Sequence, residues 1–95
     1  MVKLRGINVY PTAIGPLLQA LNGFTGEYAC RLNGERDEMT VIAEYAGADT
    51  RAKDQLAQHL REKLGVRFTV ELVAPGQTAP LTGLEHRQKP QRLIN

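Results

Sequence analysis

The chain has 95 residues, of which 42% are hydrophobic and 23% charged, proportions typical of one soluble globular domain. The only cysteine, Cys30, cannot form an internal disulfide, and no cysteine and histidine residues have metal-ligand spacing. No apolar run approaches the roughly 18 to 20 residues that span a bilayer, and no basic-then-apolar leader opens the chain, so we expect a cytoplasmic protein without a membrane partner.

The excess positive charge lies near the end of the chain. Residues 84–95 contain three basic residues and one acidic residue, so the remainder contains nine of each. Together with Arg5, this basic tail places cationic side chains at both ends of an otherwise neutral body. We expect these ends to act on a ligand or a partner.

The first elements are a strand and a helix. Residues 2–10 alternate between apolar and polar positions, and the alternation changes parity at Gly6, which predicts one strand with a bend or bulge there. Thr12 is a suitable cap for a helix whose apolar residues follow helical spacing as far as Leu21, and Asn22–Gly23 would end it.

A hairpin, a second helix and a last strand follow. Residues 28–32 and 39–45 alternate on either side of a polar turn, which predicts an antiparallel hairpin with one core face. Asp49 or Thr50 would cap a helix over residues 52–64 that Gly65 ends, and residues 66–73 form the last strand.

The order β-α-β-β-α-β predicts an α+β, ferredoxin-like fold, with two helices on one face of an antiparallel sheet. We expect one domain over residues 1–95, with its core in 1–74 and a loop and flexible basic tail in 75–95. Within the tail, 81–91 should be mobile, and Leu93–Ile94 is the apolar pair that could dock.

The candidate site residues lie in the two end segments. Lys89 on a flexible tail could carry a compact positive charge to phosphate or carboxylate oxygens, and the alternative is a solvated lysine. Arg5 and Gly6 could form a backbone ledge beside a ligand, and the alternative is a strand bend with an exposed arginine.

Other chemistries find little support. Serine is absent from the chain, and neither a phosphate-binding loop of the GxxxxGK[ST] type nor a GxGxxG motif is present. Cys30 lies in an alternating strand, which favours a buried, inert thiol. With two phenylalanines, three tyrosines and no tryptophan, stacking platforms for RNA are scarce, so we expect no nucleic-acid partner.

Four segments, in this order, resemble one known family. They are Arg5 to Pro11 (RGINVYP), Gly26 to Tyr28 (GEY), Asp37 to Val41 (DEMTV) and Val70 to Val73 (VELV), followed by the tail lysine. The chain is similar over essentially its entire length to the C-terminal domain of the phenylacetate-coenzyme A ligase family, a branch of the adenylate-forming acyl-CoA ligases.

The resemblance implies a role for each candidate. In that family the small C-terminal domain rotates against a large N-terminal adenylation domain that binds ATP and the acid. One pose delivers a tail lysine, here Lys89, to acyl-adenylate formation, and the other brings the Arg-Gly segment, here Arg5–Gly6, to the pantetheine tunnel. ATP with Mg²⁺ and coenzyme A are therefore implied for the assembled enzyme, with none bound by this chain alone, which would be inactive.

A second hypothesis is a free-standing ferredoxin-like binding or regulatory module, a homodimer through its sheet or helix faces, without ligase activity. Gly15–Pro16 and Gln88 depart from the family pattern and favour this alternative, whereas the retained Arg5 to Pro11 segment argues against it.

Overall fold

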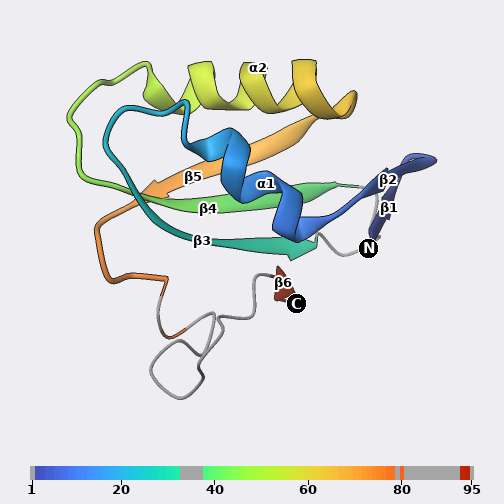
Figure 1. Cartoon of the computed structure of the whole chain (residues 1–95), viewed down its shortest axis with the longest axis horizontal. Coiled ribbons are helices and arrows are strands. Elements are labelled where there is room, and N and C mark those ends of the chain that lie inside the picture. The colour runs from blue at the N-terminus through green and yellow to red at the C-terminus, as the bar shows by residue number, and fades with distance from the viewer. Residues whose placement is uncertain (1, 33–37, 79, 81–92, 95) are drawn as a thin grey trace.

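The computed structural model describes residues 2–32, 38–78, 80 and 93–94. Two helices and six strands follow one another along these residues (Figure 1). In chain order they are β1 (Val2–Leu4), β2 (Ile7–Val9), α1 (Pro11–Leu18), β3 (Phe24–Leu32), β4 (Met39–Tyr45), α2 (Ala52–Leu64), β5 (Phe68–Val73) and β6 (Leu93–Ile94).

The first strand predicted from the sequence is in fact a small hairpin. β1 and β2 pair antiparallel, with Leu4 opposite Ile7, so the chain reverses at Arg5–Gly6 instead of bending. The prediction of one strand over residues 2–10 is therefore wrong. The change of parity at Gly6 arises because both strands direct alternate residues to the same core, and Val2, Leu4 and Val9 are all buried.

The main sheet has the order β5-β4-β3-β6. The predicted antiparallel hairpin is confirmed by the pairing of β3 with β4, whereas β4 and β5 pair in parallel. The parallel pair arises because α2 returns the chain in its original direction, and β1 and β2 pair with each other instead of separating β4 from β5. The α+β, ferredoxin-like class is confirmed, with a mixed rather than a wholly antiparallel sheet.

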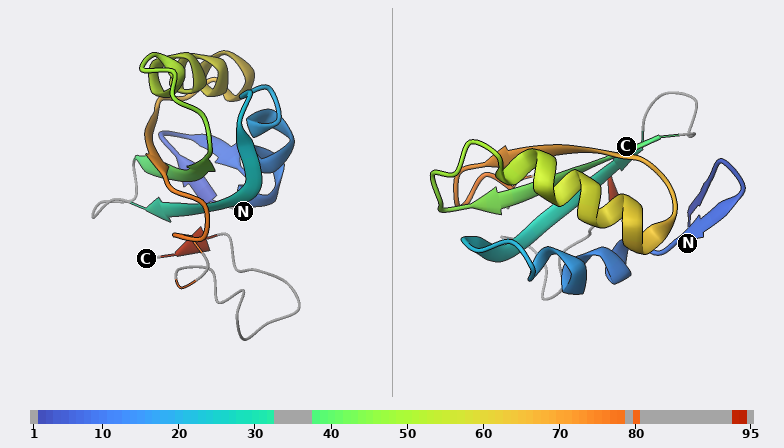
Figure 2. Two further views of the ribbon diagram at one scale, coloured as in Figure 1. Left: turned by 90° about the vertical axis from the view of Figure 1, so that its left-hand side faces the viewer. Right: turned by 90° about the horizontal axis from the view of Figure 1, so that it is seen from above.

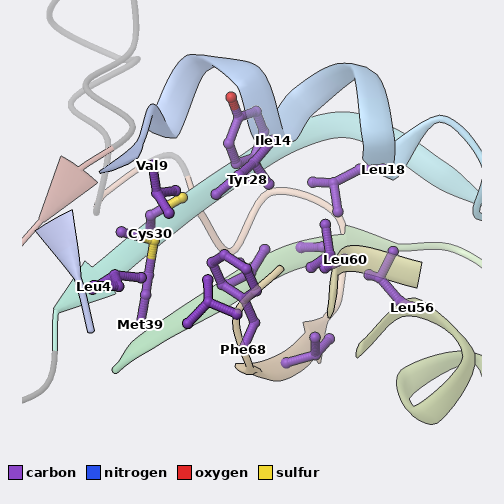
Figure 3. Packing of buried hydrophobic residues seen from close by; sticks show 14 of the residues in the cluster. Leu4, Val9, Ile14, Leu18, Tyr28, Cys30, Met39, Leu56, Leu60 and Phe68 are labelled. Carbon is purple, nitrogen blue, oxygen red and sulfur yellow. The ribbon is translucent and has the colours of Figure 1, made fainter. Parts of the chain in front are cut away.

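Both helices cover one face of this sheet, as predicted (Figures 1 and 2). Ile14 and Leu18 of α1 and Leu56 and Leu60 of α2 belong to one buried cluster with the sheet (Figure 3). Cys30 is fully buried in that cluster, which agrees with an inert core thiol. Burial of these apolar side chains, at about 1.5–3 kcal/mol each, is the main force that holds the layers together.

Helix α1 is shorter than expected and begins earlier. It starts at Pro11, so Pro16 lies inside it and Thr12 is not its cap, and it ends at Leu18. Pro16 has no N–H to bond one turn back, so this short helix has one backbone hydrogen bond fewer. Leu21 still packs against the core, although it lies beyond the helix.

Helix α2 agrees closely with the sequence. The N-cap is Arg51, which makes no side-chain cap bond, so the prediction that Asp49 or Thr50 caps the helix is wrong. Asp49 Oδ1 instead accepts a hydrogen bond from the Arg51 backbone N–H at 2.9 Å, in the turn before the helix. Gly65 ends the helix in the left-handed conformation, with φ of 78°, and its N–H bonds to the Arg61 carbonyl.

After β5, Thr78 contacts the face of the sheet opposite the helices, where its N–H bonds to Glu44 of β4. Strand β4 is buried on both faces, since Thr40, Ile42 and Glu44 are buried as well as its core-facing residues. Leu93–Ile94 pair in parallel with Cys30 and Arg31 of β3, so the prediction that this apolar pair docks is confirmed. The predicted mobility of 81–91 falls outside the described residues.

Neither helix in the described part of the chain has the length and apolarity needed to cross a membrane.

Candidate functional site

The Arg5–Gly6 turn has an unusual backbone. Arg5 has φ of 48° and Gly6 has φ of 84°, so two successive residues are left-handed. This is the pattern of the tight turns that match the twist of a two-residue hairpin, and such turns favour Asn-Gly. Arg5 is the one non-glycine residue with positive φ in the part of the chain that the structure describes. A strained arginine at this position is a candidate for function rather than for stability.

The backbone at Gly6 is open to close approach. A Cβ placed on Gly6 would meet no heavy atom within 4 Å, and the residue is exposed. A side chain there would be strained because of the positive φ, so the bare backbone is dictated by the turn itself. The turn therefore presents exposed backbone at Gly6 beside the cationic side chain of Arg5.

The Arg5 side chain forms a surface ion pair. Its Nη2 lies 3.2 Å from Oε1 of Glu38, the residue before β4, and the two side chains are 58% and 40% exposed. Pairs this exposed typically contribute between 0 and 1 kcal/mol to stability. The ion pair therefore orients the guanidinium only weakly, and an anionic ligand could displace Glu38 from Arg5.

The hairpin holds the turn rigidly at one end of the molecule. Leu4 and Val9 pack against Cys30 and Met39 at the end of the sheet where β4 begins (Figure 3). Leu4 and Val9 are 0% and 1% exposed, so the strands that support the turn are anchored in the core. The site is thus built on fixed elements rather than on a long loop.

The other predicted site residue, Lys89, lies outside the described residues. The described chain on either side of it ends at Pro80 and resumes at Leu93. Both flanks contact the sheet: Thr78 bonds to Glu44 of β4, and Leu93–Ile94 pair with β3.

A buried carboxylate on β4 was not singled out from the sequence. Glu44 is 3% exposed and accepts hydrogen bonds from the Thr25 hydroxyl at 3.1 Å and from the Thr78 backbone N–H at 3.0 Å. The Thr78 hydroxyl donates a further, short bond to the same oxygen as the N–H. Burial acts to raise the pKa of Glu44, but the bonds from Thr78, the Gly76 backbone and Thr25 outweigh it, and the pKa lies below its usual value of 4.5.

Glu44 escaped notice because it occupies the polar parity of an alternating strand, where a solvent-facing glutamate is the ordinary interpretation. One signal was available. Ile42, on the same parity, is a large apolar residue, and that suggests a strand buried on both faces.

A hollow lies between the end of α1 and the start of α2. It has a volume of about 170 Å³, and Tyr45, Asp49, Gln55 and His59 are among its polar lining residues. Tyr45 Oη accepts a bond from the Asp49 N–H, and Asp49 accepts one from the Arg51 N–H, so these groups serve the local turn. Among the described residues, no cluster of histidine, cysteine or acidic side chains could hold a metal ion.

Comparison with known proteins identifies the family. The model of the AMP-binding enzyme C-terminal domain matches residues 6–94. The chain belongs to this family. The match begins at Gly6, the second residue of the turn, and includes the whole main sheet and both helices. The expected resemblance to the C-terminal domains of acyl-CoA ligases is thereby confirmed.

Solved structures agree with this membership. An open conformation of 2-hydroxyisobutyryl-CoA ligase, in complex with 2-HIB-AMP and CoA, is 30% identical and superposes with a TM-score of 0.80. The alignment covers 100% of this AMP-binding enzyme C-terminal domain and 21% of that ligase, so the chain spans about a fifth of its length. A search of curated proteins gives no significant match.

Two further structures share the fold. A domain of phenylacetate-coenzyme A ligase from Bacteroides vulgatus ATCC 8482 is 24% identical with a TM-score of 0.75, and the alignment covers 98% of this chain and 89% of that one. The thioesterification state of 2-hydroxyisobutyryl-CoA ligase, again with 2-HIB-AMP and CoA, is 28% identical with a TM-score of 0.76 over 97% of this chain and 20% of that one.

Proposed function

We propose that the chain is the mobile C-terminal domain of an AMP-forming acid–CoA ligase, acting as one domain with a large N-terminal adenylation domain or subunit. The observation that carries this proposal is the Arg5–Gly6 turn, whose Gly6 is the first residue of the matched family region and which combines strained backbone with an exposed guanidinium. Alone, the chain would be inactive, because ATP and the acid belong to the larger partner.

The turn fits a narrow, phosphorylated cofactor such as coenzyme A. Gly6 leaves room for a thin chain to run along the backbone, since a Cβ there would meet nothing within 4 Å. Arg5 offers a planar donor group suited to phosphate oxygens. In the assembled enzyme, ATP with Mg²⁺ would activate the acid as its adenylate and coenzyme A would supply the thiol that accepts the acyl group.

Each end segment would serve one half-reaction. Lys89 would stabilise negative charge on the phosphate and carboxylate oxygens during adenylation. Arg5 and Gly6 would bind and orient the pantetheine chain during thioester formation. The two named states of 2-hydroxyisobutyryl-CoA ligase, postadenylation and thioesterification, both superpose on this chain with a TM-score of 0.76, which supports a domain that keeps its fold in both poses.

The Gly15–Pro16 departure has a packing reason that does not involve loss of function. A Cβ on Gly15 would lie 3.0 Å from the Tyr28 ring, whose hydroxyl donates to the Pro11 carbonyl at 2.9 Å. Glycine therefore accommodates a buried tyrosine under α1. This weakens the alternative of a free-standing binding module, which rested partly on that departure.

A chimera provides the direct test. This chain would replace the matching fifth of 2-hydroxyisobutyryl-CoA ligase, and pyrophosphate release and thioester formation from supplied acyl-adenylate would be measured separately. We expect both half-reactions to proceed. A folded chimera in which neither proceeds, together with no ATP-dependent acyl-CoA formation in material that the chain captures from its own cells, would favour the free-standing module.

Replacing the tail lysine should affect one half-reaction only. We expect Lys89→Ala to slow adenylation about 10²-fold to 10³-fold, the effect of losing one preorganised charge contact, and to spare thioester formation. Lys63→Ala, in the exposed last turn of α2, is the matched control and should change neither step. An equal loss in both half-reactions would contradict the role of Lys89.

A further inference from the structure

Strand β5 ends the main sheet on the side away from β6. In the described part of the chain its outer edge pairs with no strand, since its only neighbour is β4. Figure 1 shows β5 as the outermost strand, next to α2. The backbone N–H and C=O groups along such an edge can bond to a strand of another chain.

The sequence of β5 leaves this edge suitable for pairing. Proteins often protect an exposed edge with a proline or a β-bulge. Strand β5 (FTVELV) contains no proline, and its register with β4 is continuous from Phe68 to Val73. Its inner face is anchored, because Phe68 and Val70 belong to the buried cluster. The edge is therefore regular and held in place.

The outer face of β5 has opposite charges at equal distances from Thr69. Arg67, directly before the strand, precedes Thr69 by two residues, and Glu71 follows it by two. All three side chains are exposed, and residues two apart on a strand share one face. Among the described residues, neither Arg67 nor Glu71 forms an ion pair. This arrangement is complementary to a second copy of itself.

We propose that β5 pairs with β5 of a second copy of this chain, antiparallel and with Thr69 on the two-fold axis. A two-fold interface uses the same patch on both copies, so every contact occurs twice. In this register Arg67 of each copy lies opposite Glu71 of the other. Opposite charges that face each other across two strands stabilise the pairing.

Neighbouring registers lack this match. Directly opposite residues of an antiparallel pair share one face of the sheet, so exposed residues must meet exposed residues and the axis must pass through a residue. An axis one residue earlier would place Arg67 opposite Thr69, and an axis one residue later would place it opposite Val73. The charges therefore favour the register centred on Thr69.

A groove beside this edge would face the second copy. It lies between α2 and β5, has a volume of about 640 Å³, and is lined by Ala57, Gln58, Arg61, Glu62, Arg67 and Phe68. Its side chains carry both signs of charge. Because one strand edge is the main contact, we expect a small interface and weak association. Dilute chain, as used in unfolding measurements, should therefore be monomeric.

Sedimentation of the 95-residue chain is the first test, and it requires no ligase activity. We expect a monomer–dimer equilibrium between about 10 μM and 1 mM. A chain that remains monomeric at about 1 mM would overturn the proposal and leave this edge to a different partner.

Charge reversal tests the register. Arg67→Glu places acids opposite each other and Glu71→Arg places bases opposite each other, so each variant should associate about 10-fold to 100-fold more weakly. Mixed in equal amounts, the two variants should form a heterodimer about as tight as the parent dimer, because both pairs again join opposite charges. The double variant Arg67→Glu/Glu71→Arg should likewise dimerise. Urea unfolding of dilute protein checks that each variant is folded.

Single variants that dimerise as well as the parent would place the contact elsewhere and overturn the proposal. Weakened variants that do not recover on mixing would also overturn it.

A crosslink tests the position of the axis. Paired residues have Cα atoms about 4.5–5.5 Å apart, within reach of a disulfide. Thr69→Cys should therefore crosslink two copies in oxidised glutathione, whereas the control Thr50→Cys, in the exposed turn before α2, should not. The native Cys30 is buried in both variants. Equal crosslinking of the two variants would overturn the proposed axis.

Discussion

Arg5 occupies a conformation that most side chains avoid. Left-handed backbone costs a non-glycine residue roughly 1–2 kcal/mol, and asparagine is among the residues that tolerate it best. Arg5, with φ of 48°, therefore gives up stability at a position where the guanidinium would meet coenzyme A. A substitution of Arg5 that relieves the strain should therefore raise the stability of the chain and lower the rate of thioester formation.

The variant Arg5→Asn tests this opposition. It relieves the turn and removes the ion pair to Glu38, whereas the control Glu38→Gln removes the ion pair and keeps Arg5 in the turn. We expect Arg5→Asn to be more stable than Glu38→Gln by about 0.5–1 kcal/mol in urea unfolding. In the chimera, Arg5→Asn should slow thioester formation about tenfold and Glu38→Gln should not. An Arg5→Asn variant that is the less stable of the two would argue against strain at the turn.

Helix α1 packs closely against strand β3 at Gly15, because glycine has no side chain. Gly15 lies over the ring of Tyr28, which is 4% exposed and held by its bond to Pro11. Alanine would ordinarily favour a helix by up to about 1 kcal/mol over glycine. Here its methyl group would press on a ring that has little freedom to move.

We expect Gly15→Ala to destabilise the chain by about 1 kcal/mol, since overpacking exceeds the gain in helix propensity. In a Tyr28→Leu background the same change should be neutral or stabilising, because the contact with the ring is gone. Urea unfolding of the four proteins in this double-mutant cycle gives the coupling. Additive effects would mean that the two residues do not interact.

Sequence reasoning succeeded where a pattern was local. The β3–β4 hairpin and α2 with its Gly65 cap follow from alternation, helical spacing and one glycine. It failed where the partner was remote. The bonds of Glu44 depend on Thr78, far along the chain. The reversal at Arg5–Gly6 is local, and it was missed because an arginine, not the usual asparagine, occupies the first left-handed position of the turn. Arg5, Gly6 and Lys89 were candidates because of their charge, their backbone freedom and their place in the end segments, and the family resemblance implied the role of each.

At the scale of the whole molecule, Glu44 links stability to acidity. Its folded-state pKa lies below the ordinary 4.5, so the ionised form is favoured by folding. The stabilisation is therefore fully present above about pH 4.5 and is lost as pH falls through the lower, folded-state pKa. Protonation would weaken the bonds that join the sheet to the segment after β5.

We expect Glu44→Gln to lower the free energy of unfolding by about 1–2 kcal/mol at pH 7, because neutral acceptors bind these donors less strongly. The difference from the parent should shrink as pH falls below about 4.5. Thermal and urea unfolding between pH 3 and 7 measure it, with the exposed Glu71→Gln on β5 as control. A constant difference across this range would show that Glu44 is not preferentially ionised in the folded state.

The placement of β6 bears on how the domain forms during synthesis. Strand β3 gains its first neighbour once residue 45 has been made, but its other edge waits for Leu93–Ile94. At about 5–20 residues per second, a ribosome would leave that edge open for a few seconds. An open edge invites pairing with other chains, so nascent molecules would be most prone to aggregate in that interval.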